Sequence, residues 1–92
     1  MAKKTSVSLG TALDIVHAEA LKKRLTTALE KQLPVVLISD KVEKADTSGL
    51  QLICAFANKL EQNGLPLSWQ KPSDALRQTS EILGLSDSLR LE

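Results

Sequence analysis

Aromatic residues are almost absent from this sequence, where Phe56 and Trp69 make up 2% of 92 residues. A core must therefore be aliphatic, and the hydrophobic content of 42% supplies the side chains for one compact domain. The single cysteine, Cys54, excludes an internal disulfide and suits a reducing compartment. We interpret Cys54 as a small hydrophobic core residue rather than as a reactive thiol.

Long apolar runs and an excess of one charge are also missing. No run approaches the roughly 20 residues of a membrane-spanning helix, so we expect no direct membrane insertion. The N-terminal residues 1–6 lack the apolar stretch of a secretory signal. Twelve basic and 11 acidic residues give a net charge of +1, which argues against nucleic acid as a partner. We expect a cytoplasmic protein that is a monomer on its own.

Residues for catalysis and metal binding are scarce as well. One histidine, His17, and one cysteine cannot supply a metal site made of protein ligands alone. A serine nucleophile needs a base within hydrogen-bond reach, whereas His17 is expected to begin a helix as a solvated residue. There is no Gly-x-Ser-x-Gly elbow and no Gly-rich phosphate loop. We therefore expect no enzyme activity, no cofactor and no metal.

What the chain does have is an alternation of strand and helix patterns. Val35–Ile38 is a continuous apolar run, which is typical of a central strand covered on both faces. Lys22–Arg24 is interpreted as the solvated face of a helix, and Leu76, Ile82 and Leu83 as the apolar side of another. The predicted elements are a strand at 5–9, a strand at 12–15, a helix at 16–31, a strand at 35–38, a helix at 46–63, a strand at 65–70, a helix at 73–83 and a short helical turn within 85–92.

This order, β-β-α-β-α-β-α, predicts an α/β fold. Strands that alternate with helices imply right-handed crossovers and parallel neighbours in a sheet. We expect residues 1–92 to form a single domain with a four-stranded mixed sheet and with helices mainly on one face. The first two strands are expected to pair with each other.

A hydroxyl-rich helix start is the most informative part of the sequence. Asp46-Thr47-Ser48-Gly49-Leu50 follows a polar turn, and the backbone N–H groups at a helix start attract oxygen atoms and negative charge. Capping of the helix is one explanation, since Asp, Ser and Thr are the usual capping residues. The other is that Ser48, with Thr47 as the weaker candidate, is a substrate for a protein kinase. A phosphate adds about −1.5 to −2 charges, which would repel a docked partner without unfolding the helix.

The segment around this helix start, Val42–Ile53, resembles the signature of STAS domains, the anti-sigma factor antagonist family. The resemblance covers nearly the whole chain. Further segments similar to landmarks of the family are Leu13-Asp14, Val35–Ser39, Gly64–Leu67 and Leu83–Leu85.

One position departs from the family pattern. The family often has glycine where this chain has Thr11, and here the glycine lies one residue earlier, at Gly10. This variation, together with Gln51 and the ending at Leu83–Leu85, looks most similar to small STAS proteins encoded with chemotaxis components.

The resemblance implies a protein-binding module switched by phosphorylation. In antagonist members, the unphosphorylated domain binds a serine kinase that doubles as an anti-sigma factor, and phosphorylation of the serine matching Ser48 ends the binding. Two alternatives use the same helix: a non-switching STAS subunit bound to the ATPase of a phospholipid-transport ABC complex, and an adaptor in chemotaxis or sensory signalling. The partner-binding residues implied are Asp46, Thr47, Ser48, Gly49 and Gln51.

Overall fold

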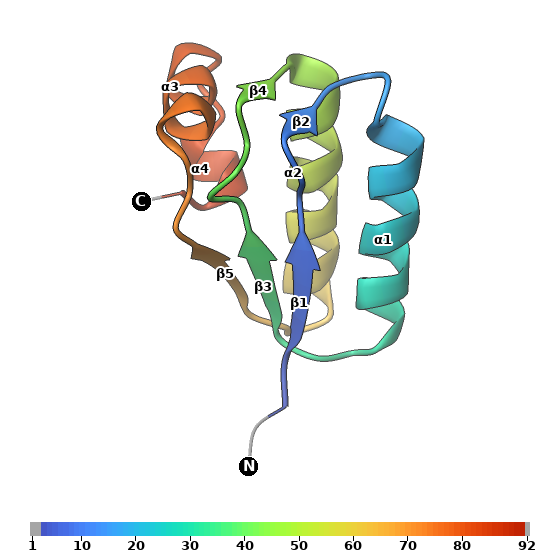
Figure 1. Cartoon of the computed structure of the whole chain (residues 1–92). Coiled ribbons are helices and arrows are strands. Elements are labelled where there is room, and N and C mark those ends of the chain that lie inside the picture. The colour runs from blue at the N-terminus through green and yellow to red at the C-terminus, as the bar shows by residue number, and fades with distance from the viewer. Residues whose placement is uncertain (1–2, 92) are drawn as a thin grey trace.

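Parallel strands in two small sheets form the centre of the computed structural model, which describes residues 3–91. The larger sheet has three parallel strands in the order β1-β3-β5, and the smaller has two, β2 and β4. The smaller sheet lies beyond the ends of β1 and β3 (Figure 1). The strands are β1 (Thr5–Ser8), β2 (Ala12–Leu13), β3 (Val35–Ile38), β4 (Lys44–Ala45) and β5 (Leu67–Gln70).

The helices are α1 (Ala18–Glu30), α2 (Thr47–Gln62), α3 (Asp74–Ile82) and α4 (Ser86–Leu89). α1 and α2 pack side by side, and α1 also contacts β1 (Figure 1). α4 packs on α2, while α3 contacts β4 and α4. The predicted α/β class and the parallel strand neighbours are confirmed.

The prediction of one four-stranded mixed sheet is wrong, because the strands divide into two parallel sheets. Three residues, 9–11, separate β1 from β2, whereas five residues, 39–43, separate β3 from β4. Two extra residues on one side of a ladder break its register, as in a bulge. The ladder that begins as β1–β3 therefore resumes as β2–β4 only after a gap.

The predicted pairing of the first two strands is also wrong. Gly10 adopts a left-handed conformation with φ of 71°, but the bend there does not reverse the chain. β2 continues in the direction of β1 and pairs with β4 (Figure 1). The backbone N–H of Leu9 still bonds to Ile38 O at 3.0 Å, and Thr11 O then accepts from the N–H of Glu43 at 2.8 Å. A hairpin between β1 and β2 would need a reversal that this segment does not make.

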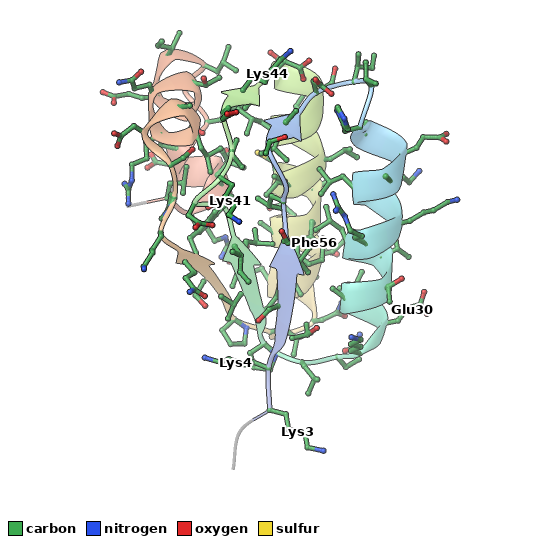
Figure 2. The ribbon with its side chains drawn as sticks, viewed as in Figure 1. Lys3, Lys4, Glu30, Lys41, Lys44 and Phe56 are labelled. Carbon is green, nitrogen blue, oxygen red and sulfur yellow. The ribbon has the colours of Figure 1, made fainter. Side chains whose placement is uncertain are left out.

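One side of the sheet carries the core. In β1, Thr5 and Val7 are buried while Ser6 and Ser8 are exposed, as expected for a half-buried strand. Phe56 on α2 is the one aromatic side chain in a core that is otherwise aliphatic, and Figure 2 marks its position behind the sheet. The side chains that are less than 2% exposed include Leu9, Leu13, Leu21, Leu37, Leu50, Ile53, Leu60, Leu76 and Leu89.

The last helices follow the prediction in part. Ser73 caps α3, since its hydroxyl accepts the N–H of Leu76 at 3.1 Å, and Leu76 is buried as expected. The prediction that Ile82 lies on the apolar side is wrong, because Ile82 is 83% exposed at the end of α3. It lies two residues past the buried Ser80, and two residues turn a helix by about 200°, so Ile82 faces away from the core.

The predicted helical turn near the end of the chain is confirmed as α4. Leu89 is completely buried, and Leu85 and Leu91 pack partly against the core. The indole Nε1 of Trp69 donates a hydrogen bond of 2.8 Å to Leu89 O, which ties α4 to β5. A side-chain pair between Arg90 and Glu61, 2.7 Å apart, adds a second connection from this region to α2.

Candidate protein-binding surface

The start of α2 is held by Asp46. Its backbone N–H donates to Leu13 O at 2.9 Å, which anchors it to β2. Its carboxylate accepts the N–H of Gly49 at 3.0 Å. Asp46 is therefore the N-cap of the helix, as the capping explanation predicted.

Gly49 lies where α2 meets β2. A Cβ atom added at Gly49 would overlap the backbone carbonyl of Leu13, so only glycine allows this approach. Gly49 is buried, and its backbone shapes the turn beneath the surface. Its predicted contact with a partner stays a prediction.

The side chains around this corner differ in exposure. Thr47 and Gln51 are exposed and four residues apart, so they lie on one side of the helix. Ser48 is half-buried, while Leu50 is completely buried and anchors the first turn in the core. Asp46 makes the capping bond of the helix, and the hydroxyl of Ser48 has no hydrogen-bond partner among residues 3–91. It is neither sealed in the interior nor used by the fold.

The turn between β2 and α1 begins next to the start of α2, because Leu13, the last residue of β2, accepts the backbone N–H of Asp46. His17 Nδ1 lies 2.6 Å from the carboxylate of Asp14, and the backbone N–H of His17 donates to the same oxygen at 3.1 Å. The side-chain hydrogen bond from His17 is the main reason that the pKa of Asp14 is lowered, and the charge of Lys44 adds to the effect. Lys44 lies at the end of the molecule where α2 begins (Figure 2).

Two apolar residues in this turn are strongly exposed and were not predicted as part of the site. Ile15 is 71% exposed and Val16 is 81% exposed. The sequence interpretation placed Ile15 in a strand and Val16 in a helix, but the Asp14–His17 turn separates the two elements. Two consecutive apolar residues between Asp14 and His17 were the available signal. We call Ile15, Val16, Thr47, Ser48 and Gln51 the α2-start surface.

The remaining candidate residues lie as follows. Cys54 is half-buried against the core, and burial raises the pKa of its thiol. A higher pKa leaves less thiolate, which agrees with its interpretation as a small hydrophobic residue. His17 is exposed just before α1, and Lys22, Lys23 and Arg24 form a solvated face.

Within residues 3–91, no three His, Cys, Asp or Glu side chains gather as a metal site would require. No helix in that range is both long and apolar enough to span a bilayer.

Comparison with known proteins gives one family. The family model described as "Mlab, STAS domain" matches residues 2–91. The match includes the α2-start surface and each strand and helix given above. A comparison with curated proteins gives no match.

Proposed function

Because the chain belongs to the STAS domain family, we propose that it is a regulatory module that binds a partner protein through the α2-start surface. The observation that carries this proposal is the exposure of Ile15 and Val16 in the turn that follows β2, and of Thr47 in the first turn of α2, which contacts β2. Apolar side chains surrounded by polar ones are typical of protein-binding surfaces. STAS domains are regulatory or protein-interaction modules, and such a surface suits that role.

In this proposal, phosphorylation of Ser48 ends the binding. The phosphate would lie in the first turn of α2, where the helix dipole favours negative charge. The fold would persist because the capping bond belongs to Asp46 and not to Ser48. A partner seated on the same surface would meet about −1.5 to −2 additional charges and the cost of desolvating them. Binding would therefore change without a change of fold.

The partner in this proposal is a serine kinase that doubles as an anti-sigma factor, and the module acts in the cytoplasm without a catalytic role of its own. Among residues 3–91, the imidazole of His17 bonds to Asp14 and to no serine, so it offers no serine a general base. Thr47 is the second modification candidate, and it is more exposed than Ser48.

Partner affinity of serine variants tests the switch. The partner is the purified kinase, ATPase or chemotaxis protein encoded beside this chain, and affinity is measured by calorimetry. We expect Ser48→Ala to bind as the wild type does and Ser48→Asp to bind roughly tenfold or more weakly. Asn58→Asp is the control, since it adds a negative charge at an exposed position further along α2, outside the α2-start surface, and is expected to bind as the wild type does. Intact mass of the protein from its native cells then shows whether a phosphate is present and on how many sites.

A second variant tests the surface independently of the switch. Replacing both Ile15 and Val16 by serine removes the exposed apolar contacts and leaves the core unchanged. We expect a loss of partner affinity without a change in the midpoint of urea unfolding. Full affinity in this variant would contradict the α2-start surface as the binding site.

The half-burial of Ser48 favours a second candidate function. A kinase needs a serine that it can reach, and a half-buried hydroxyl suits a permanent interface better. In this case the chain is a non-switching STAS subunit, such as one that binds the ATPase of a phospholipid-transport ABC complex, or an adaptor in chemotaxis signalling. Full affinity of Ser48→Asp would reject the switch and leave this second function standing.

A further inference from the structure

A groove lies between β1 and α1, at the open edge of the three-stranded sheet. Its volume is about 330 Å³. β1 is the outer strand there, with β3 as its neighbour on one side only. The residues that line the groove are Thr5, Ser6, Val7, Ser8, Lys23, Arg24, Thr27, Ala28 and Lys31.

The backbone of β1 presents unused hydrogen-bonding groups to this groove. The N–H groups of Thr5 and Leu9 bond to β3, at 2.8 Å to Pro34 O and 3.0 Å to Ile38 O. Alternate residues of a parallel strand bond to the same neighbour, so the N–H and C=O groups of Ser6 and Ser8 point to the open edge. The side chains of both serines are exposed and stand perpendicular to the sheet, so they do not cover this edge.

The charges along the groove have one sign. Lys23, Arg24 and Lys31 line it, and no acidic residue does. The Lys31 ammonium lies 3.5 Å from Thr5 Oγ1, which places a positive charge at one end of β1. Figure 2 shows Lys3 and Lys4 just before β1 at the same end. The groove therefore combines a strand edge with a basic wall.

The two sides of the groove, β1 and the basic side of α1, also have similar lengths. A strand of four residues spans about 13 Å at about 3.3 Å per residue. Along α1, the distance from Lys23 to Lys31 is about 12 Å at about 1.5 Å per residue. A short extended segment of another protein could therefore contact the strand edge and the basic helix wall over the same length.

We propose that β1 is a second binding site, at which an extended acidic segment of a partner protein adds to the sheet as a new strand. Its main chain pairs with the N–H and C=O groups of Ser6 and Ser8, and its carboxylates lie against Lys23, Arg24 and Lys31. Main-chain pairing supplies affinity in this mode, while side chains supply specificity. The site does not include Ser48 and does not depend on the proposed switch.

The positive charge of the groove favours an acidic segment of a partner over a second copy of this chain. Two copies joined edge to edge would bring two basic walls together, and like charges in contact oppose association. A nucleic acid would match the charge but has no peptide groups to pair with Ser6 and Ser8. Both possibilities become outcomes of the test.

The probe is a short fluorescent peptide of alternating glutamate and valine, with both ends blocked, and fluorescence anisotropy measures its binding. Ser6→Pro removes one outward N–H group, and proline is tolerated on edge strands. We expect this variant to bind the peptide roughly tenfold more weakly than the wild type. Ser6→Ala keeps the N–H group and is the matched control, with unchanged affinity expected.

Charge is tested by the double variant Lys23→Glu with Arg24→Glu. We expect it to lose peptide binding by roughly tenfold or more. Lys71→Glu is the control for charge at the opposite edge of the sheet, after β5, and is expected to bind as the wild type does. A lysine–valine peptide should not bind to the wild type.

If Ser6→Pro does not fold, a peptide N-methylated at alternate amides replaces it, tested on the wild-type protein. We expect one of the two methylation patterns to abolish binding. Equal binding of both methylated peptides, or unchanged affinity of folded Ser6→Pro, would overturn strand addition. Preferential binding of a single-stranded oligonucleotide, or a dimer that Ser6→Pro dissociates, would also overturn the proposal.

Discussion

The backbone N–H of Gly49 donates a 3.0 Å hydrogen bond to the carboxylate of Asp46, and this bond begins α2. Asp46→Ala removes the acceptor and is expected to lower the free energy of unfolding by about 1 kcal/mol. Asp46→Asn keeps an oxygen acceptor and should stay within a few tenths of the wild-type value. Urea unfolding followed by circular dichroism measures both. Equal stability of Asp46→Ala and wild type would show that the cap contributes nothing.

Gly49→Ala reverses the usual effect of this substitution in a helix. Alanine normally stabilises a helix relative to glycine by about 0.5–1 kcal/mol. Here the added methyl group overlaps the Leu13 carbonyl, so we expect destabilisation of about 1–3 kcal/mol. Thr47→Ala, at an exposed position in the same turn, should change stability by less than about 0.5 kcal/mol. The same urea titration compares the two, and a stabilised Gly49→Ala would contradict the close approach of α2 to β2.

The pKa of Asp14 is held below 3.8, chiefly by its hydrogen bond with the side chain of His17. A carboxyl group with a lower pKa in the folded state stabilises the fold while it is ionised. Its contribution is therefore present above a pH of about 4 and is lost as the pH falls through the folded-state pKa. His17→Ala should raise the pKa of Asp14, and Lys44→Ala should raise it less. An NMR titration of the Asp14 carboxyl carbon measures both shifts, and no shift in His17→Ala would reject this assignment.

Leu89 and Ile82 provide a matched pair near the end of the chain. Leu89 is completely buried, and Leu89→Ala should cost about 2–5 kcal/mol of unfolding free energy. Ile82 is 83% exposed, so Ile82→Ala should change stability by less than about 0.5 kcal/mol. Trp69, the single tryptophan, bonds to Leu89 O and reports unfolding by fluorescence. Similar costs for the two variants would contradict the packing of α4.

Local patterns in the sequence predicted the positions of the elements well, although β3 is fully buried on one face only and not on both as predicted. The apolar run of Val35–Ile38 became β3, and the polar residues at Asp46 and Ser73 became N-caps. These features depend on neighbours within a few residues, so a sequence shows them directly. Both termini of α2 were within two residues of the prediction for the same reason.

Strand pairing was harder to predict because it depends on distant segments. The break between the two sheets follows from unequal spacers, 9–11 and 39–43, which matter only once β1 and β3 are known to pair. The exposure of Ile15 was missed because an apolar residue in a turn has no strand or helix period to place it. The exposure of Ile82 was missed because the buried side of α3 is marked by Leu76 and by Ser80, which is polar and gave no hydrophobic signal. The close contact between Gly49 and the Leu13 carbonyl arises because β4, which leads into α2, pairs with β2. The sequence alone does not show this pairing, so the contact could not be predicted from it.

The parallel topology has a consequence for how the chain folds. Among the described strands, each ladder joins strands that are not consecutive along the chain: β1 with β3, β2 with β4, and β3 with β5. No hairpin can form early and serve as a template, and the first ladder must wait until α1 has brought residues 35–38 back to residues 5–8. Closing such long loops costs entropy before any contact repays it, which slows folding. During synthesis, the N-terminal strand therefore stays unpaired until β3 has left the ribosome.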